Sequence, residues 1–140
     1  MKASVSIVLC TYNGAKYIRE QLDSIIAQTY PLHEIIVQDD HSTDEITEIL
    51  QEYACRHNLI KVFQNDSAQG VNGNFLSAMQ RATGEYIAIS DQDDIWETDK
   101  IENQINSIGK NLLCSGLSRP FSTDGSFAYF DQRKRNVHAI

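Results

Sequence analysis

Three carboxylates, Asp91, Asp93 and Asp94, lie within four residues of one another. Residues 85–90, directly before them, are rich in apolar and β-branched side chains, as is typical of a buried β-strand. Carboxylates this close repel one another unless a positive charge lies between them. Mg²⁺ and Mn²⁺ bind through one or two carboxylates together with substrate phosphates. The apolar strand and the adjacent Trp96 favour such a metal–phosphate site over a solvated loop in which Asp94 only caps the next helix.

A second acidic pair, Asp39 and Asp40, follows another apolar segment, Glu34–Gln38. The polar turn Thr11–Asn13 ends a third such segment in the same way. Ligands of an open parallel sheet bind at the carboxyl ends of its strands. We therefore expect one cleft, in which one acidic pair accepts hydrogen bonds from a base or from ribose hydroxyls and the other cluster holds the cation. The alternative for Asp40 is that it only caps the following helix.

Strands and helices are expected to alternate along the chain. Strands are predicted at Ser4–Cys10, Glu34–Gln38, Ile60–Gln64 and 85–90, and helices at 15–29, behind residues 41–45, at 75–82 and at 101–108. Asn13 is predicted to cap the first helix, and Ser42 with Glu45 has the spacing of a capping box. Residues 65–74 are polar and contain glycine, so they are predicted to form a loop. This order indicates an α/β fold with a mostly parallel, doubly wound sheet.

The composition excludes several classes of protein. A net charge of −7 argues against a nucleic-acid partner, and no apolar segment approaches the length of a membrane span. The three cysteines, Cys10, Cys55 and Cys114, form no close pair, which argues against a disulfide framework and against a zinc site. Without a signal segment, the cytoplasm is the expected compartment.

Several segments together resemble the inverting family 2 glycosyltransferases, whose GT-A fold is a Rossmann-like, three-layer α/β structure. The matching segments are Val5–Gly14, Leu22–Tyr30, Ile36–Asp44, Ala82–Ile87 and Ser90–Trp96. They span roughly the first hundred residues in the family's order and spacing. The Asp-Gln-Asp-Asp-Ile-Trp form of the last segment is most similar to rhamnosyltransferases of cell-surface polysaccharide assembly. The resemblance implies a UDP- or dTDP-linked sugar donor and a glycan or lipid-linked acceptor.

The resemblance also implies a role for individual residues. The predicted nucleotide-sugar site consists of Cys10, Thr11, Tyr12, Asn13, Asp39, Asp40, Asp91 and Gln92. The backbone at Cys10 and Thr11, with Asp40, would hold the base, and Asp91 and Gln92 would approach the ribose and pyrophosphate. Asp93 matches the metal-ligating carboxylate of the family's Asp-x-Asp motif, so Asp93 and Asp91 are the predicted ligands of Mg²⁺ or Mn²⁺. His41 departs from the family pattern, since glycine is common at this position.

We expect the chain to contain the donor half of such a domain. Residues 1–110 are assigned to donor binding and 111–140 to the start of the acceptor side, with further short strands at 112–114 and 127–130. The family's general base lies beyond this length, so no catalytic base is assigned. The full protein is expected in the cytoplasm, at the inner face of the membrane if it associates peripherally.

Three other functions remain open from the residues alone. The chain could hold a nucleotide without transferring a sugar. It could be a sugar-phosphate nucleotidyltransferase, although the glycine-rich, basic first turn of those enzymes is absent from Thr11–Ala15. It could be a phosphohydrolase with an Asp-x-Asp nucleophile, for which Asp91 and Asp93 have the spacing.

Overall fold

The computed structural model describes residues 1–116, and the predicted strand at 127–130 lies outside this range. The chain divides into two compact units, residues 1–101 and 102–140. Every strand of the described chain belongs to the first unit, which therefore contains the whole described sheet. Among the described residues, no helix is long and apolar enough to cross a membrane.

Four parallel strands form the sheet, as the sequence predicts. They are β1 (Val5–Thr11), β2 (Glu34–Asp39), β3 (Ile60–Gln64) and β4 (Tyr86–Ser90), in the order β3-β2-β1-β4. The two central strands are buried along their full length because they have a neighbour on each side and helices on each face. The carboxyl ends of β2, β1 and β4 therefore lie next to one another at one edge of the sheet.

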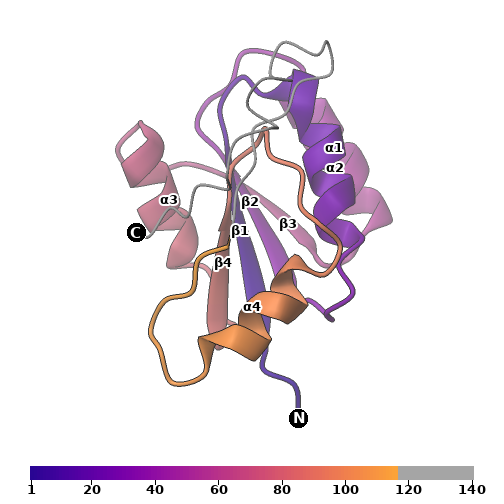
Figure 1. Cartoon of the computed structure of the whole chain (residues 1–140). Coiled ribbons are helices and arrows are strands. Elements are labelled where there is room, and N and C mark those ends of the chain that lie inside the picture. The colour runs from indigo at the N-terminus through magenta and orange to yellow at the C-terminus, as the bar shows by residue number, and fades with distance from the viewer. Residues whose placement is uncertain (117–140) are drawn as a thin grey trace, which may run out of the picture. The chain divides into compact units, whose positions relative to one another are not determined.

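Helices cover both faces of this sheet and give the first unit three layers. α1 (Ala15–Ile26) and α2 (Ile46–Arg56) lie on one face, and α3 (Val71–Met79) lies on the other (Figure 1). α4 (Lys100–Ile108) begins at the end of the first unit and continues into the second. Beneath α3, a cluster of Val8, Cys10, Ile36 and Ala78 forms part of the core, with Phe63, Phe75, Met79 and Ala82 packed around it.

The predicted cap residues bind elsewhere. Asn13 does not cap α1; its side-chain oxygen accepts the N–H of Thr43 at 2.8 Å. The N–H of Ala15 instead donates to the carboxylate of Asp44 at 2.9 Å, and the same carboxylate accepts the N–H at the start of α2. Ser42 donates to Asp39 and forms no capping box. The two turns that precede α1 and α2 are thus tied to each other, which a prediction limited to local spacing cannot detect.

Three further predictions about elements are wrong. α3 begins at Val71, inside the segment 65–74 that was predicted to be a loop. Its Asn74 is polar but buried, because Gln38 of β2 donates to its side-chain oxygen at 3.0 Å. β4 was predicted to be buried, yet Ile87 and Ile89 are 43% and 55% exposed, since β4 is an edge strand of the described sheet. Residues 112–114 form no strand.

Candidate nucleotide-binding site

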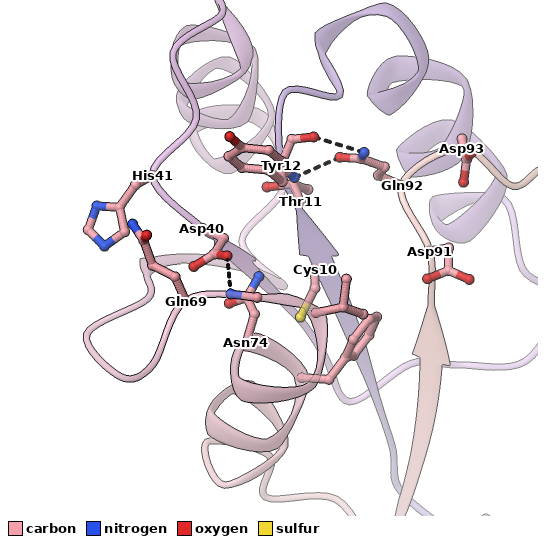
Figure 2. A pocket seen from close by; sticks show the side chains of 13 residues that line it. Cys10, Thr11, Tyr12, Asp40, His41, Gln69, Asn74, Asp91, Gln92 and Asp93 are labelled. Atoms are coloured by element: carbon pink, nitrogen blue, oxygen red, sulfur yellow. Dashed lines mark hydrogen bonds between the residues drawn. The ribbon is translucent and has the colours of Figure 1, made fainter.

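A cavity of about 430 Å³ opens at the carboxyl edge of the sheet. Its volume lies within the usual range for small-molecule sites. It is lined by Cys10, Thr11, Tyr12, Asp40, His41, Gln69, Gly70, Val71, Asn74, Phe75, Asp91, Gln92 and Asp93. Cys10 and Thr11 form its middle, Asp40 lies on the β2 side, and Asp91 and Asp93 lie on the β4 side (Figure 2). The three strand ends that the sequence predicts to form one cleft therefore do so.

Most of the predicted site residues line this cavity, and two support it from outside. Cys10, Thr11, Tyr12, Asp40, Asp91 and Gln92 are in the lining, as is the predicted metal ligand Asp93. Asp39 is buried beneath the turn and accepts hydrogen bonds from the hydroxyl of Thr11 at 2.8 Å and from the N–H of Ser42 at 2.9 Å. The N–H of Asn13 donates to the Ser42 hydroxyl at 2.8 Å. Asp39 and Asn13 therefore fix the shape of the turns.

Asp40 is held in place by donors from the other side of the cavity. Its carboxylate accepts the side-chain N–H of Asn65 at 2.7 Å and the backbone N–H of Gly70 at 2.8 Å. A carboxylate offers about four lone-pair positions, so Asp40 can still accept a further donor from a ligand. Gly70 has a φ of 110°, a conformation that favours glycine, and α3 begins directly after it. Asp40 thus joins β2 to the start of α3.

The sequence did not identify the wall formed by Gln69, Gly70, Val71, Asn74 and Phe75. The available signal was a polar, glycine-containing segment directly after a predicted strand. Such segments often contribute to binding sites in α/β folds because they follow the carboxyl end of a strand.

His41 adopts the left-handed backbone conformation, with a φ of 62°. This conformation is costly for most residues and natural for glycine, which explains why glycine is common here in the family that the sequence resembles. This chain adopts the conformation with a histidine, and His41 lines the cavity.

The acidic loop is attached to α1 by a row of polar side chains. Gln21, which is fully buried, donates to the hydroxyl of Ser90 at the end of β4. Ser24, one turn further along, accepts the N–H of Trp96 at 3.0 Å. Two residues after the end of α1, the side-chain nitrogen of Gln28 donates to the backbone oxygen of Glu97 at 2.8 Å. The side chain of Trp96 is buried, so Asp91, Asp93 and Asp94 lie on a loop that is anchored at both ends.

Charge repulsion is built into this loop. Loss of hydration, followed by the negative charge of Asp93, raises the pKa of Asp91 above its usual range. Loss of hydration and the charges of Asp91 and Asp93 also raise the pKa of Asp94, while Lys100 partly offsets this effect. Both shifts mean that the protein disfavours the ionised carboxylates when no cation is bound. A bound cation would relieve this repulsion.

The residues fit a cation that is held jointly with a substrate. Within residues 1–116, no three histidine, cysteine, aspartate or glutamate side chains are arranged as a metal site. This donor set does not suit zinc or calcium, which require more protein ligands. Mg²⁺ and Mn²⁺ need only one or two carboxylates when phosphate oxygens complete the coordination, and Asp91 and Asp93 can supply these. Asp94 does not line the cavity.

Comparison with known proteins identifies the family. A sequence model described as glycosyl transferase family 2 matches residues 6–138. The chain belongs to this family. The predicted GT-A fold is confirmed by solved structures, among them a mannosyltransferase of Pyrobaculum calidifontis in complex with GDP-Man and Mn²⁺. It superposes with a TM-score of 0.73 at 27% identity, over 93% of this chain and 39% of the other. Family membership decides against the nucleotidyltransferase and phosphohydrolase alternatives.

Two similar proteins have names that state a biosynthetic pathway or a transfer reaction. A Bacillus subtilis (strain 168) glycosyltransferase, provisionally assigned to teichuronic acid biosynthesis, is 36% identical over 74% of this chain and 41% of its own length. An Escherichia coli protein named UDP-glucose:α-D-GlcNAc-diphosphoundecaprenol β-1,3-glucosyltransferase is 36% identical over 78% of this chain and 42% of its own length. The chain thus spans about two fifths of the length of these relatives.

Cys10 lies in the cavity wall but is expected to be unreactive. Burial, followed by the negative charges of Asp40 and Asp91, raises the pKa of its thiol to about 12. At about pH 8, roughly one molecule in 10,000 would carry the reactive thiolate. We therefore expect iodoacetamide to modify the exposed Cys55 first and to leave Cys10 unmodified until the protein unfolds. Peptide mapping by mass spectrometry over a time course would check this order, and labelling of Cys10 as fast as that of Cys55 would contradict it.

Proposed function

We propose that residues 1–110 bind the sugar donor of an inverting, metal-dependent glycosyltransferase. The donor would be a UDP- or dTDP-linked sugar, and the acceptor a saccharide or a lipid-linked glycan in cell-surface polysaccharide biosynthesis. The observation that carries this proposal is the arrangement of charge in the cavity. One carboxylate, Asp40, faces two others, Asp91 and Asp93, across the end of β1. A nucleoside diphosphate has a base N–H for the first and, with a cation, a diphosphate for the other two.

Each wall of the cavity would contact a different part of the donor. Asp40 can accept the ring N–H of uracil or thymine, and the backbone at Cys10 and Thr11 would lie against the same base. Asp91 would accept hydrogen bonds from ribose hydroxyls and share the cation with Asp93. A divalent cation bound there would supply Lewis-acid stabilisation of the leaving diphosphate, an effect of several kcal/mol. The residues of this chain thus bind and orient the donor.

Transfer with inversion also requires a general base for the acceptor hydroxyl. In residues 1–116, the carboxylates of the cavity are Asp40, Asp91 and Asp93, and each has a role on the donor side in this proposal. We therefore assign none of them as the base. Donor binding and sugar transfer are separate properties to measure, since the chain spans about two fifths of its relatives. A lipid-linked acceptor would place the full protein at the inner face of the membrane.

Calorimetry on the wild-type chain tests the donor site directly. We expect UDP or dTDP to bind with a dissociation constant between about 1 μM and 1 mM in the presence of Mn²⁺, and much more weakly in EDTA. GDP is the control for the base, because the ring N–H and the oxygens of guanine are arranged differently. Equal binding of GDP would contradict the proposed preference for uracil or thymine. Folded protein that binds no nucleotide under either condition would contradict the donor site as a whole.

A further inference from the structure

A single side chain connects the turn after β1 to the acidic loop after β4. The side-chain oxygen of Gln92 accepts the N–H of Tyr12 at 2.8 Å, and its side-chain nitrogen donates to the carbonyl oxygen of Tyr12 at 3.0 Å (Figure 2). The pairing of β1 with β4 ends at Leu9 and Ser90. Gln92 therefore extends the connection between these two segments beyond the sheet, because its amide pairs with both backbone groups of one residue.

Gly14 provides the space for this side chain. A Cβ atom on Gly14 would lie 2.1 Å from the side-chain oxygen of Gln92 and 2.4 Å from its amide carbon, distances that no real contact allows. The φ of Gly14 is −107°, which any residue can adopt. The glycine is therefore required for its small size and not for its backbone conformation. Gly14, Tyr12 and Gln92 form one structural unit, which we call the Gln92 clamp.

We propose that Gln92 is a positioning residue that fixes the distance between the two walls of the nucleotide site. This proposal deepens the proposed function and rests on it. Because the amide oxygen and the amide nitrogen of Gln92 both bond to Tyr12, we assign the side chain an effect on the ligand through this neighbour. On one side it holds Tyr12, which is 58% exposed and lines the cavity. On the other side it is flanked in sequence by Asp91 and Asp93.

Loss of the clamp should lower the affinity for a ligand that contacts both walls. It should have a smaller effect on the affinity for a ligand that contacts a single wall. Uracil, the free base without ribose, would contact Asp40 and the end of β1, which are attached to each other without Gln92. UDP with Mn²⁺ would also contact Asp91 and Asp93, so its affinity depends on how the acidic loop is placed relative to Tyr12. Loss of the clamp should therefore weaken UDP–Mn²⁺ binding and leave uracil binding nearly unchanged. If Gln92 were needed only for folding, its replacement would weaken the binding of both ligands.

Three variants test this prediction: Gln92→Ala, Gly14→Ala and the double variant. Two hydrogen bonds are lost in Gln92→Ala, so UDP–Mn²⁺ affinity should fall by about tenfold in calorimetry. Uracil affinity, measured by NMR titration, should change by less than about twofold. Gly14→Ala should produce the same pattern, because its new methyl group displaces Gln92. Gln51→Ala, on an exposed position of α2, is the matched control and should bind both ligands as the wild type does.

The double variant shows whether the two positions act together. Once Gln92 is shortened, the three atoms nearest to the methyl group at position 14 are gone, so the double variant should bind no more weakly than Gln92→Ala alone. Additive losses would overturn the clamp, and so would equal losses of uracil and UDP–Mn²⁺ binding. If the wild type bound neither ligand, the proposed function would fail. The melting temperatures of the same variants would then test the clamp. Additive decreases in the double variant would again contradict it.

Discussion

Replacing Asp93 with asparagine is expected to abolish the Mn²⁺-dependent part of UDP binding. The substitution keeps the shape of the side chain and removes the charge that the proposed cation site requires. We expect the affinity for UDP in the presence of Mn²⁺ to fall by about 100-fold or more, to the level that the wild type shows in EDTA. Asp93 is exposed, so the variant should fold normally. Calorimetry with Mn²⁺ and with EDTA on both proteins measures the effect.

Asp99→Asn is the matched control for this experiment. It removes the same charge from an exposed position nearby that does not line the cavity. If Asp99→Asn weakened binding as strongly as Asp93→Asn, the effect would arise from overall charge and not from a metal ligand. Unchanged, Mn²⁺-dependent binding of UDP by Asp93→Asn would show that the assignment of Asp93 is wrong.

Replacing Glu34 with glutamine is expected to cause a large loss of stability. Glu34 is buried at the edge of the sheet opposite the cavity, and its carboxylate accepts hydrogen bonds from three separate segments. The donors are the hydroxyl of Ser6 at 2.8 Å, the ammonium group of Lys61 at 2.7 Å, and both the N–H and the hydroxyl of Thr83 at 2.8 Å. A glutamine would aim an NH₂ group at one of these donors. The free energy of unfolding, measured in urea, should fall by about 2–4 kcal/mol.

The loss should depend on pH in a defined direction. Burial acts to raise the pKa of Glu34, but the hydrogen bonds from Lys61, Thr83 and Ser6 outweigh it and lower the pKa from 4.5 to about 2. A lowered carboxylate pKa adds stability above the unfolded value of about 4.5, and this stability disappears as the pH falls towards 2. The difference in the free energy of unfolding between the wild type and Glu34→Gln should therefore be largest at neutral pH. It should decrease between about pH 4.5 and pH 2.

Glu52→Gln is the control for Glu34→Gln. Glu52 also pairs with cationic side chains, Arg19 and Arg56, but it does so at the surface. Its replacement should leave the urea midpoint close to that of the wild type, because exposed ion pairs contribute little. The role assigned to the ionised carboxylate would be contradicted if the difference in the free energy of unfolding between the wild type and Glu34→Gln stayed constant from pH 7 to pH 3.

The sequence predicts the sheet well because the signals for its strands are local. Apolar, β-branched segments such as Ile35–Val37 have few alternatives to a buried strand, and the four parallel strands are confirmed. The cleft could also be predicted, since strand ends that carry acidic residues must meet at one edge of a parallel sheet. The assignment of individual residues to base, ribose and metal remains a prediction.

Other features depend on contacts between residues far apart in the sequence. α3 was predicted to start too late because Asn74 is polar, yet Gln38 of β2 satisfies it in the core. The caps were predicted from spacing, whereas the structure uses Asp44 for two helix starts at once. The sequence gives no sign that Gln21 is buried, because its side-chain nitrogen is satisfied by the distant Ser90 and its side-chain oxygen by Ser24. Such pairs can be found only when the fold is known.

The attachment of the acidic loop to α1 has a consequence for the entropy of binding. Ser24 of α1 accepts the N–H of Trp96, and Gln28, two residues after the end of α1, accepts the N–H of Ile101. The loop between β4 and α4 is thus ordered before any ligand arrives. The cation of the proposed site would therefore not have to restrict a flexible segment, and little conformational entropy would be lost on binding. Relief of the repulsion among Asp91, Asp93 and Asp94 would then contribute to cation affinity, because the fold already holds these charges together.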